Sequence, residues 1–271
     1  MQSERYVTIV IPLVPSHDRF LQELIPQLSG ERHVIAKVIL ARSSARKREL
    51  PHLLRIVRSL QADYGLDIEV LATHRLQLAG QNRNRGWHHV STPFTAFLDA
   101  DDEYAEDRIS RLVEVARDDQ SDLVIHDYLL KETQTDTLPL ATWKTEDLIQ
   151  TEALYAATFP RGRDRTREGS IPGDTNIHVP QTSSHQWNVC HGHILVRTEL
   201  RRTYQYTNLY PGEDGQFCRD LLWGGRRVTY VPARLSAYRP NLSAETQAGY
   251  ALRVGRKLAR LRRQMRANLS G

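Results

Sequence analysis

The sequence has few cysteines and lacks a long apolar run. Its two cysteines, Cys190 and Cys218, fit neither a disulfide framework nor a zinc site. No apolar stretch approaches the roughly 20 residues that a helix needs to cross a bilayer. Residues 1–5 also lack the basic-then-apolar pattern of a secretory signal. We therefore expect a protein of the reduced cytoplasmic compartment.

A strong excess of one charge sign is also absent. The chain has 37 Lys and Arg against 32 Asp and Glu, a net charge of +5. Such an excess suits phosphate-bearing substrates or an anionic membrane surface. Because no nucleic-acid module is recognisable, nucleic acid is not an expected partner. With 271 residues, 40% of them hydrophobic, the chain has room for one large or two small globular domains.

The most informative stretch covers residues 94–104. An apolar run, typical of a buried strand, ends in the carboxylates Asp99, Asp101 and Asp102. Strand alternation puts Asp99 and Asp101 on one side and Asp102 on the other. Two carboxylates at one strand tip repel each other unless a cation or a proton lies between them. Hard oxygen ligands of this kind suit Mg²⁺ or Mn²⁺.

The same acids also allow structural interpretations. They can form a solvated turn, and Asp102 is expected to be the N-cap of a helix over residues 107–116. An EF-hand loop is excluded, because Tyr104 stands where that loop requires glycine.

Strand and helix patterns alternate before the acidic stretch, which is typical of a doubly wound parallel sheet. Ligands of such sheets bind beyond the carboxyl ends of the strands, and the acidic pair falls at such an end. The expected strands are 6–12, 34–40 and 67–71, and the expected helices are 20–28 and 50–60.

Residues 80–87, just before the acidic strand, are interpreted as a loop and the start of a helix. Arg83 is either a surface cation or a cleft residue, and Asn84 is either a helix cap or a cleft residue. Consecutive βαβ elements are usually neighbours in space, so both side chains are expected to line the same cleft as Asp99.

The middle of the chain combines helix, strand and loop patterns. A strand is expected at 122–128, a helix at 143–157 and a strand at 191–197. Residues 160–184 favour a long loop, either a functional lid or substrate loop, or partial disorder. Nearby are three histidines and a tryptophan that allow ligand-binding or ordinary structural roles: His185, His191, His193 and Trp187.

A second informative stretch covers residues 210–225. Glu213 and Asp214 open a helix that ends at residues 224–225 and is followed by a strand at 228–231. The two acids either favour the helix dipole or supply a general base beside the metal site. Residues 250–271 carry seven Lys or Arg and no acid, and their apolar residues Tyr250, Val254, Leu258, Leu261 and Met265 recur at helical spacing. This basic amphipathic helix suits an anionic membrane, a partner, or docking on its own domain.

These pieces together resemble the family 2 glycosyltransferases of the GT-A fold. The resemblance spans residues 6–240 and rests on the order and spacing of seven short motifs. They are residues 7–12, 83–86, 98–102, 212–214, 224–228, 230–232 and 238–239.

The resemblance implies an α/β GT-A fold with a mainly parallel sheet flanked by helices. It implies a nucleotide-sugar-binding half at 1–105, an acceptor-binding and catalytic half at 106–240, and the basic helix at 241–271. Family members transfer a sugar from a nucleotide diphosphate donor, usually with inversion. The resemblance leaves the acceptor open: the expected classes are a carbohydrate, a lipid-linked molecule or a small molecule, in polysaccharide or glycoconjugate biosynthesis.

The resemblance also implies roles for individual residues. Asp214 resembles the base that deprotonates the acceptor hydroxyl, with Glu213 as the second candidate. Mn²⁺ or Mg²⁺ is the implied cofactor. The donor side comprises Pro12, Arg83, Asn84, Asp99 and Asp101, and the implied metal ligands are Asp101, Asp99 and His193.

Two departures bear on the donor. Family members commonly carry an acid after the second strand that holds the nucleotide base, whereas residues 40–44 contain none. Residues 13–15 replace the usual Tyr-Asn pair after the first strand. A UDP-sugar is the favoured donor, and a non-catalytic GT-A-like scaffold or a nucleotidyltransferase are the alternatives. A haloacid-dehalogenase-type phosphatase is disfavoured, because Glu103 stands where that motif has Thr or Val. Peripheral contact with the inner face of a membrane and a homo-oligomer are left open.

Overall fold

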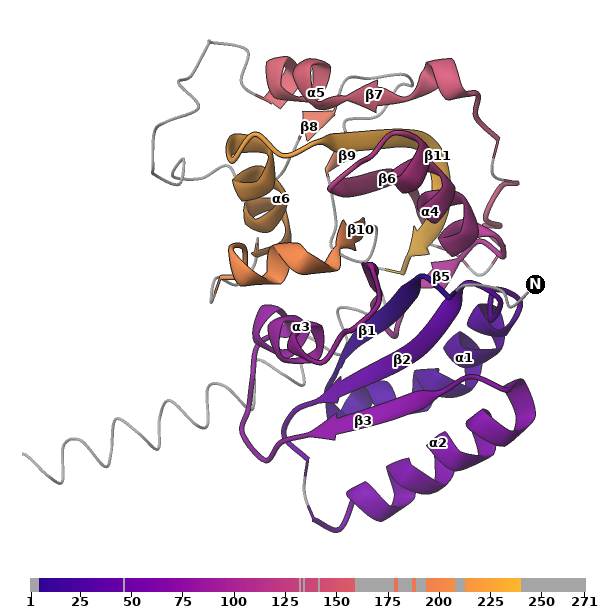
Figure 1. Ribbon diagram of the computed structural model, residues 1–271. Coiled ribbons are helices and arrows are strands. Elements are labelled where there is room, and N and C mark those ends of the chain that lie inside the picture. Colours follow the sequence, from indigo (N-terminus) through magenta and orange to yellow (C-terminus); the bar gives the residue numbers. More distant parts are fainter. Residues whose placement is uncertain are drawn as a thin grey trace, which may run out of the picture.

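Among the described residues, the main sheet has nine strands: eight follow the order β3-β2-β1-β4-β10-β6-β11-β5, and β7 pairs with β11 beside this path. It is seen in a computed structural model (Figure 1), which describes residues 5–45, 47–131, 133, 135–140, 142–158, 178–179, 187–188, 194–207 and 213–239. Two short strands, β8 (His178–Val179) and β9 (Trp187–Asn188), form a separate antiparallel pair.

The first half of the chain forms the parallel part of the sheet, as the alternating pattern predicts. Every residue of β1 is buried, because a central parallel strand is covered by helices on both faces. The strands are β1 (Val7–Leu13), β2 (Ile35–Arg42), β3 (Ile68–Ala72) and β4 (Phe94–Phe97). The helices are η1 (Pro15–Phe20), α1 (Leu21–Ser29), α2 (Leu50–Tyr64) and α3 (Ala79–His88).

The second half extends the same sheet with strands of both directions. Strand β10 is antiparallel to both of its neighbours, β4 and β6, so the latter two run in the same direction. The strands are β5 (Glu103–Tyr104), β6 (Leu123–Leu130), β7 (Ile149–Gln150), β10 (Ile194–Arg197) and β11 (Val228–Tyr238). The helices are α4 (Arg108–Asp118), η2 (Thr145–Asp147), α5 (Thr151–Thr158), η4 (Thr198–Arg202) and α6 (Glu213–Trp223).

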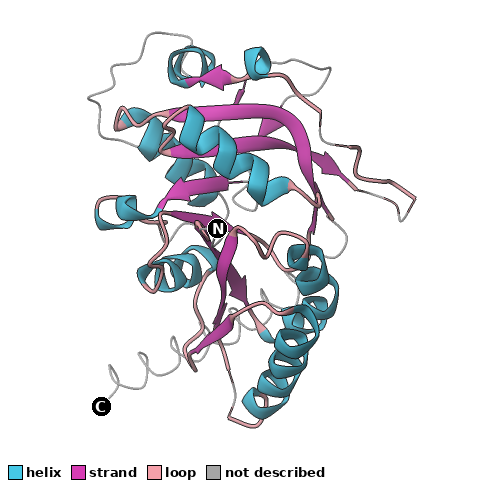
Figure 2. Cartoon of the chain, turned by 45° about the vertical axis from the view of Figure 1, so that its right-hand side comes forward, coloured by secondary structure: helices cyan, strands magenta, loops and turns pink. Residues whose placement is uncertain are grey.

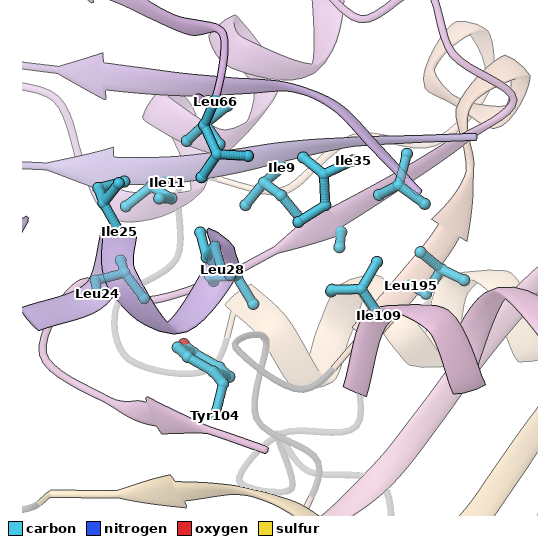
Figure 3. Packing of buried hydrophobic residues seen from close by; sticks show 14 of the residues in the cluster. Ile9, Ile11, Leu24, Ile25, Leu28, Ile35, Leu66, Tyr104, Ile109 and Leu195 are labelled. Carbon is cyan, nitrogen blue, oxygen red and sulfur yellow. The ribbon is translucent and has the colours of Figure 1, made fainter. Parts of the chain in front are cut away.

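The hydrophobic core is divided by the sheet into two clusters, with helices on both sides of the strands (Figure 2). One cluster joins α1, α2 and α4 to the sheet, and Figure 3 shows Leu24, Ile25 and Leu28 of α1 beside Ile9 and Ile11 of β1. The other joins α3 and α6 to the opposite face. Each buried aliphatic side chain contributes roughly 1.5–3 kcal/mol to folding. The sheet and the first cluster both continue across the predicted boundary at residue 105.

Two local predictions are wrong. Asp102 does not cap a helix: it lies in a turn before β5, and α4 begins only at Arg108. The backbone N–H groups of Ile109 and Ser110 donate instead to the carboxylate of Glu31, at 3.0 and 2.6 Å. A distant buried acid therefore occupies the electropositive end of α4.

The predicted helix over residues 143–157 is interrupted. Lys144 and Asp147 close a short turn through a 2.9 Å hydrogen bond, β7 follows, and α5 begins only at Thr151. The strand β7 exists because it pairs with β11, a contact that local periodicity does not reveal.

Several predicted features lie outside the described residues: most of the loop at 160–184, His185, His191, His193 and the tail at 241–271. Trp187 is described only as part of β9, without its side-chain surroundings. Across the part of the chain that is described, the helices are all too short or too polar to cross a membrane.

Candidate functional site

The acidic turn follows β4 at the carboxyl edge of the parallel strands. The N–H of Asp99 donates to the hydroxyl oxygen of Tyr104 at 2.8 Å, and that hydroxyl donates to the Asp99 carbonyl at 3.0 Å. Burial raises the pKa of Tyr104 well above its ordinary value, and Asp102 and Asp99 act in the same direction. The phenol therefore stays protonated and holds the turn through both hydrogen bonds.

The end of β11 closes over the same turn through Arg239. Its backbone N–H donates to Asp102 at 3.3 Å, and its guanidinium donates to the carbonyl oxygen of Asp101. The same guanidinium forms a 3.1 Å ion pair with Glu23 of α1. Arg239 appeared in the sequence only as the end of a motif, and the structure assigns it the role of fixing the acidic turn.

Two carboxylates of the turn lie close enough to influence each other. Asp101 is only 6% exposed. Burial raises the pKa of Asp101 above its ordinary value and the charge of Asp99 acts in the same direction, whereas His17 and Arg239 oppose the increase. Asp99 and Asp101 thus repel each other at a buried position, where a cation would relieve the repulsion.

The oxygen donors of this turn suit Mg²⁺ or Mn²⁺, which accept few protein carboxylates when phosphate oxygens complete the coordination. Within the described ranges, no three Asp, Glu, His or Cys side chains gather as a cluster that could hold a metal ion. Asp99 and Asp101 therefore fit the cation as a partial ligand set, and the predicted third ligand, His193, lies outside the described residues.

Arg83 connects the acidic turn with the start of α6. Its side chain is fully buried, and its guanidinium donates to Asp99 at 2.8 Å and to Glu213 at 3.2 Å. Burial alone would lower the pKa of Arg83, but the charges of Asp99 and Glu213 outweigh it and raise this pKa. One permanent cation thus neutralises two carboxylates, Asp99 and Glu213, that are 114 residues apart in the sequence.

Helix α3, which carries Arg83, lies beside β1 (Figure 1), and two of its glycines allow a close approach to neighbouring residues. A Cβ at Gly86 would lie 2.5 Å from Cγ1 of Val10 in β1, and a Cβ at Gly80 would lie 2.9 Å from Cβ of Tyr206. The helix predicted within residues 80–87 is present, but it covers the whole stretch, and the predicted loop part is wrong. The two glycines of this helix permit the close packing.

The side chain of Asn84, also in α3, is hydrogen-bonded to the backbone of Tyr206. Its amide donates to the Tyr206 carbonyl at 2.8 Å and accepts from the Tyr206 N–H at 2.9 Å. Both polar ends of the side chain are thus engaged by one backbone segment. Tyr206 in turn stacks on Phe217 of α6, with ring centroids 4.2 Å apart. Asn84 therefore positions the aromatic layer beneath α6 instead of capping a helix.

The first turn of α6 carries both predicted base candidates. Glu213 is 5% exposed and ion-paired with Arg83, whereas Asp214 is only partly buried. The charge of Asp214 acts on Arg83, Tyr206 and Cys218. The Asp214 carboxylate therefore lies near the group formed by Arg83, Asp99 and Glu213, the Arg83 cluster. The two neighbouring acids therefore occupy different environments.

The carboxyl ends of β1 and β2 lie side by side. Pro12, a predicted donor-site residue, is buried in β1 opposite Ala41 of β2. The next residue of β2, Arg42, is 1% exposed and makes a two-pronged ion pair with Asp18 of η1, at 2.9 and 3.0 Å. A guanidinium thus lies at the strand end where the resemblance leads one to expect an acid. Sequence reasoning noted the missing acid but missed the partner, 24 residues earlier.

A family model described as glycosyl transferase family 2 matches residues 50–179. Solved structures of similar fold include S. aureus TarS, at 13% identity and a TM-score of 0.54 over 86% of this chain and 36% of that chain. TarS 1–349 in complex with UDP shares 12% identity, with a TM-score of 0.55 over 86% of this chain and 60% of that chain.

A mannosyltransferase from Pyrobaculum calidifontis, in complex with GDP-Man and Mn²⁺, shares 13% identity. Its TM-score is 0.56, over 87% of this chain and 57% of that chain. The present chain thus spans less than two thirds of each of these proteins. No curated protein sequence matches it. Residues 50–179 thus match the glycosyl transferase family 2 model, and the chain has the GT-A fold of these solved glycosyltransferases.

Proposed function

We propose that this protein transfers a sugar from a nucleotide diphosphate donor to an acceptor hydroxyl, with inversion and with a divalent metal ion. A UDP-sugar is the favoured donor. The proposal depends on one observation above all: Arg83 joins Asp99 of the acidic turn to Glu213 of α6 by ion pairs of 2.8 and 3.2 Å. These ion pairs support the proposal, because they connect a proposed donor-site residue with the neighbour of the proposed base at the edge of the sheet where ligands of α/β proteins usually bind.

Solved structures with this fold support a nucleotide-sugar donor. TarS has been solved with UDP and with UDP-GlcNAc, and the P. calidifontis mannosyltransferase with GDP-Man and Mn²⁺. In the present chain, Asp99 and Asp101 would hold the metal ion. Bound there, the ion would neutralise negative charge that develops on the departing diphosphate.

The acceptor base in this proposal is Asp214. Inversion requires one base, on the face of the sugar opposite the leaving group. Glu213 is buried, and its carboxylate already accepts from the Arg83 guanidinium, so its role is to hold Arg83 in place. The partly exposed Asp214 follows at the rigid start of α6, where a carboxylate can reach an incoming hydroxyl.

Recognition of the nucleotide base is the least conventional part of the proposal. Arg42 and Asp18 neutralise each other where the family pattern places an acid. This observation favours the second candidate function, a GT-A-like scaffold that binds a nucleotide or glycan without turnover. The first function accounts for Asp214 beside the Arg83 cluster, and we therefore prefer it.

Nucleotide binding tests the donor site directly. We expect calorimetry to show binding of one of UDP, GDP and dTDP that requires Mn²⁺ and is lost in Asp101→Ala. Asp63→Ala, an exposed carboxylate of α2, serves as the matched control and should bind as the wild type does. Failure of all three nucleotides to bind with Mn²⁺ present would contradict the metal–diphosphate site. Binding without any turnover of the corresponding nucleotide-sugar would favour the scaffold.

The location proposed here is cytoplasmic, with contact between residues 241–271 and the inner face of a membrane. The basic composition of these residues supports this proposal. Co-sedimentation with anionic phospholipid vesicles, with and without residues 241–271, tests it.

A further inference from the structure

Backbone register aligns four buried residues across the centre of the sheet. Ile194 of β10 is opposite Phe97 of β4 and Ile125 of β6, and Ile125 is opposite Tyr230 of β11. All four belong to the same hydrophobic cluster, on the face of α3 and α6. Phe97 of β4 and Ile125 of β6 are therefore level with each other along the strand direction.

Two residues beyond the row, both β4 and β6 lead to an aspartate. Asp99 follows Phe97 by two residues, and Asp127 follows Ile125 by two. Within β6, a spacing of two puts Asp127 on the same face as Ile125. Only β10 lies between the two strands, and neighbouring strands are about 4.8 Å apart, so the two backbones are separated by roughly 10 Å. Asp127 therefore lies near the acidic turn, on the acceptor side of the sheet.

Asp127 has polar neighbours that the proposed donor site does not use. Its carboxylate accepts from the N–H of Tyr128 at 2.6 Å and lies 3.6 Å from Nε of Arg234. The register of β11 shifts between Val231 and Arg234, which brings Arg234 opposite Asp127. Bulges of this kind often redirect a side chain beside a functional site.

The hydroxyl of Tyr230 is buried next to this carboxylate. Tyr230 is 1% exposed, and within the described ranges its hydroxyl has no hydrogen-bond partner. Burial raises the pKa of Tyr230 above its ordinary value, and the charge of Asp127 acts in the same direction, so the two groups are electrostatically close. A buried phenol without a partner destabilises the fold, and a bound ligand that hydrogen-bonds to it would remove this penalty.

The three groups offer complementary hydrogen bonding. The Asp127 carboxylate accepts, the Arg234 guanidinium donates, and the Tyr230 hydroxyl does either. With Asp127 and Arg234 close to neutral as a pair, the cluster favours an uncharged ligand with neighbouring hydroxyl groups. Burial also raises the pKa of Asp127 to about 6, so the ionised carboxylate lowers the stability of the folded protein at neutral pH.

We propose that Asp127, Tyr230 and Arg234 form a subsite that binds hydroxyl groups of a carbohydrate acceptor. The proposal rests on the proposed function. The roughly 10 Å between β4 and β6, the strands that lead to Asp99 and Asp127, leaves room for the transferred sugar beside the acceptor. The subsite binds and orients the acceptor, and the proton of the attacking hydroxyl still goes to Asp214.

The test measures saccharide binding to the full chain by saturation-transfer NMR, in the presence of UDP and of Mg²⁺, which is diamagnetic and does not broaden the ligand signals. The probes are the methyl glycosides of glucose, galactose, mannose and N-acetylglucosamine. We expect at least one to receive saturation from the wild-type protein, and Asp127→Asn and Tyr230→Phe each to reduce that transfer about tenfold. Asp63→Asn and Tyr64→Phe in α2 are the matched controls and should retain it.

Thermal melting verifies that each variant is folded, and nucleotide calorimetry is run on the same samples. No transfer to any of the four glycosides in the wild type, or equal transfer in wild type and variants, would overturn the subsite. If the wild-type protein does not bind the nucleotide, the proposed donor site is instead contradicted. The two measurements therefore distinguish failure of this inference from failure of the proposed function.

Discussion

At the scale of single residues, the ion pairs of Arg83 with Asp99 and Glu213 have a measurable consequence for stability. Replacing Arg83 by Met keeps much of the side-chain volume but leaves Asp99 and Glu213 without their shared cation. Removing one member of a buried ion pair typically lowers stability by about 3–5 kcal/mol. We expect Arg83→Met to lower the free energy of unfolding in urea by that amount.

Arg85→Met is the matched control on the same helix. Its guanidinium donates to Asn82 at 2.9 Å, and the described residues give it no ion pair. Arg85→Met should therefore lower the free energy of unfolding by less than about 1.5 kcal/mol, the net contribution of an ordinary hydrogen bond. Equal losses in the two variants would show that the Arg83 ion pairs add no stability.

The pH dependence of stability tests the environment of Asp127. Its folded-state pKa of about 6 exceeds the ordinary 3.8, so the folded protein binds this proton more tightly than the unfolded chain. The resulting stability is complete below about pH 4 and is lost as the pH rises through 6. We expect Asp127→Asn to raise the free energy of unfolding relative to wild type more at pH 7.5 than at pH 4.5. A difference that does not change with pH would refute a buried, destabilised carboxylate.

At the scale of elements, the approach of α3 to β1 determines where Arg83 lies. Alanine at Gly86 would favour the helix by about 1 kcal/mol, but its Cβ would lie 2.5 Å from Val10. Overpacking usually costs about 1–3 kcal/mol. We expect Gly86→Ala to lower the melting temperature and to weaken nucleotide binding, because a displaced α3 moves Arg83 away from Asp99.

Gly30→Ala is the control for that substitution. Gly30 follows α1 with a φ of −61°, and a Cβ there would meet no atom within 4 Å. Alanine at this position should leave stability unchanged or slightly higher. If Gly86→Ala were equally harmless, close packing of α3 would not be what positions Arg83.

At the scale of the whole molecule, local pattern predicted the parallel half of the fold well. The strands β1, β2 and β3 and the helices α1 and α2 begin and end within a few residues of their predicted limits, because each carries its own apolar periodicity. The order of the motifs likewise predicted the GT-A fold.

Contacts between distant residues were not predictable in this way. Glu31 binds the start of α4, Asp18 neutralises Arg42, and Arg239 fixes the acidic turn, and each partner lies at least 24 residues away. The short strand β5 exists through pairing with β11. A local window contains none of these partners, so sequence alone identified the candidate acids but not the groups that hold them.

The aligned row of Phe97, Ile194, Ile125 and Tyr230 has a consequence for variation among relatives. Backbone hydrogen bonds between β4, β10, β6 and β11 fix this row, and they do not depend on which side chains occupy it. Segments joining these strands can therefore lengthen, shorten or change composition without altering the alignment of Phe97 with Ile125. The loops at this edge of the sheet are thus free to vary while the strands that lead to Asp99 and Asp127 keep their order.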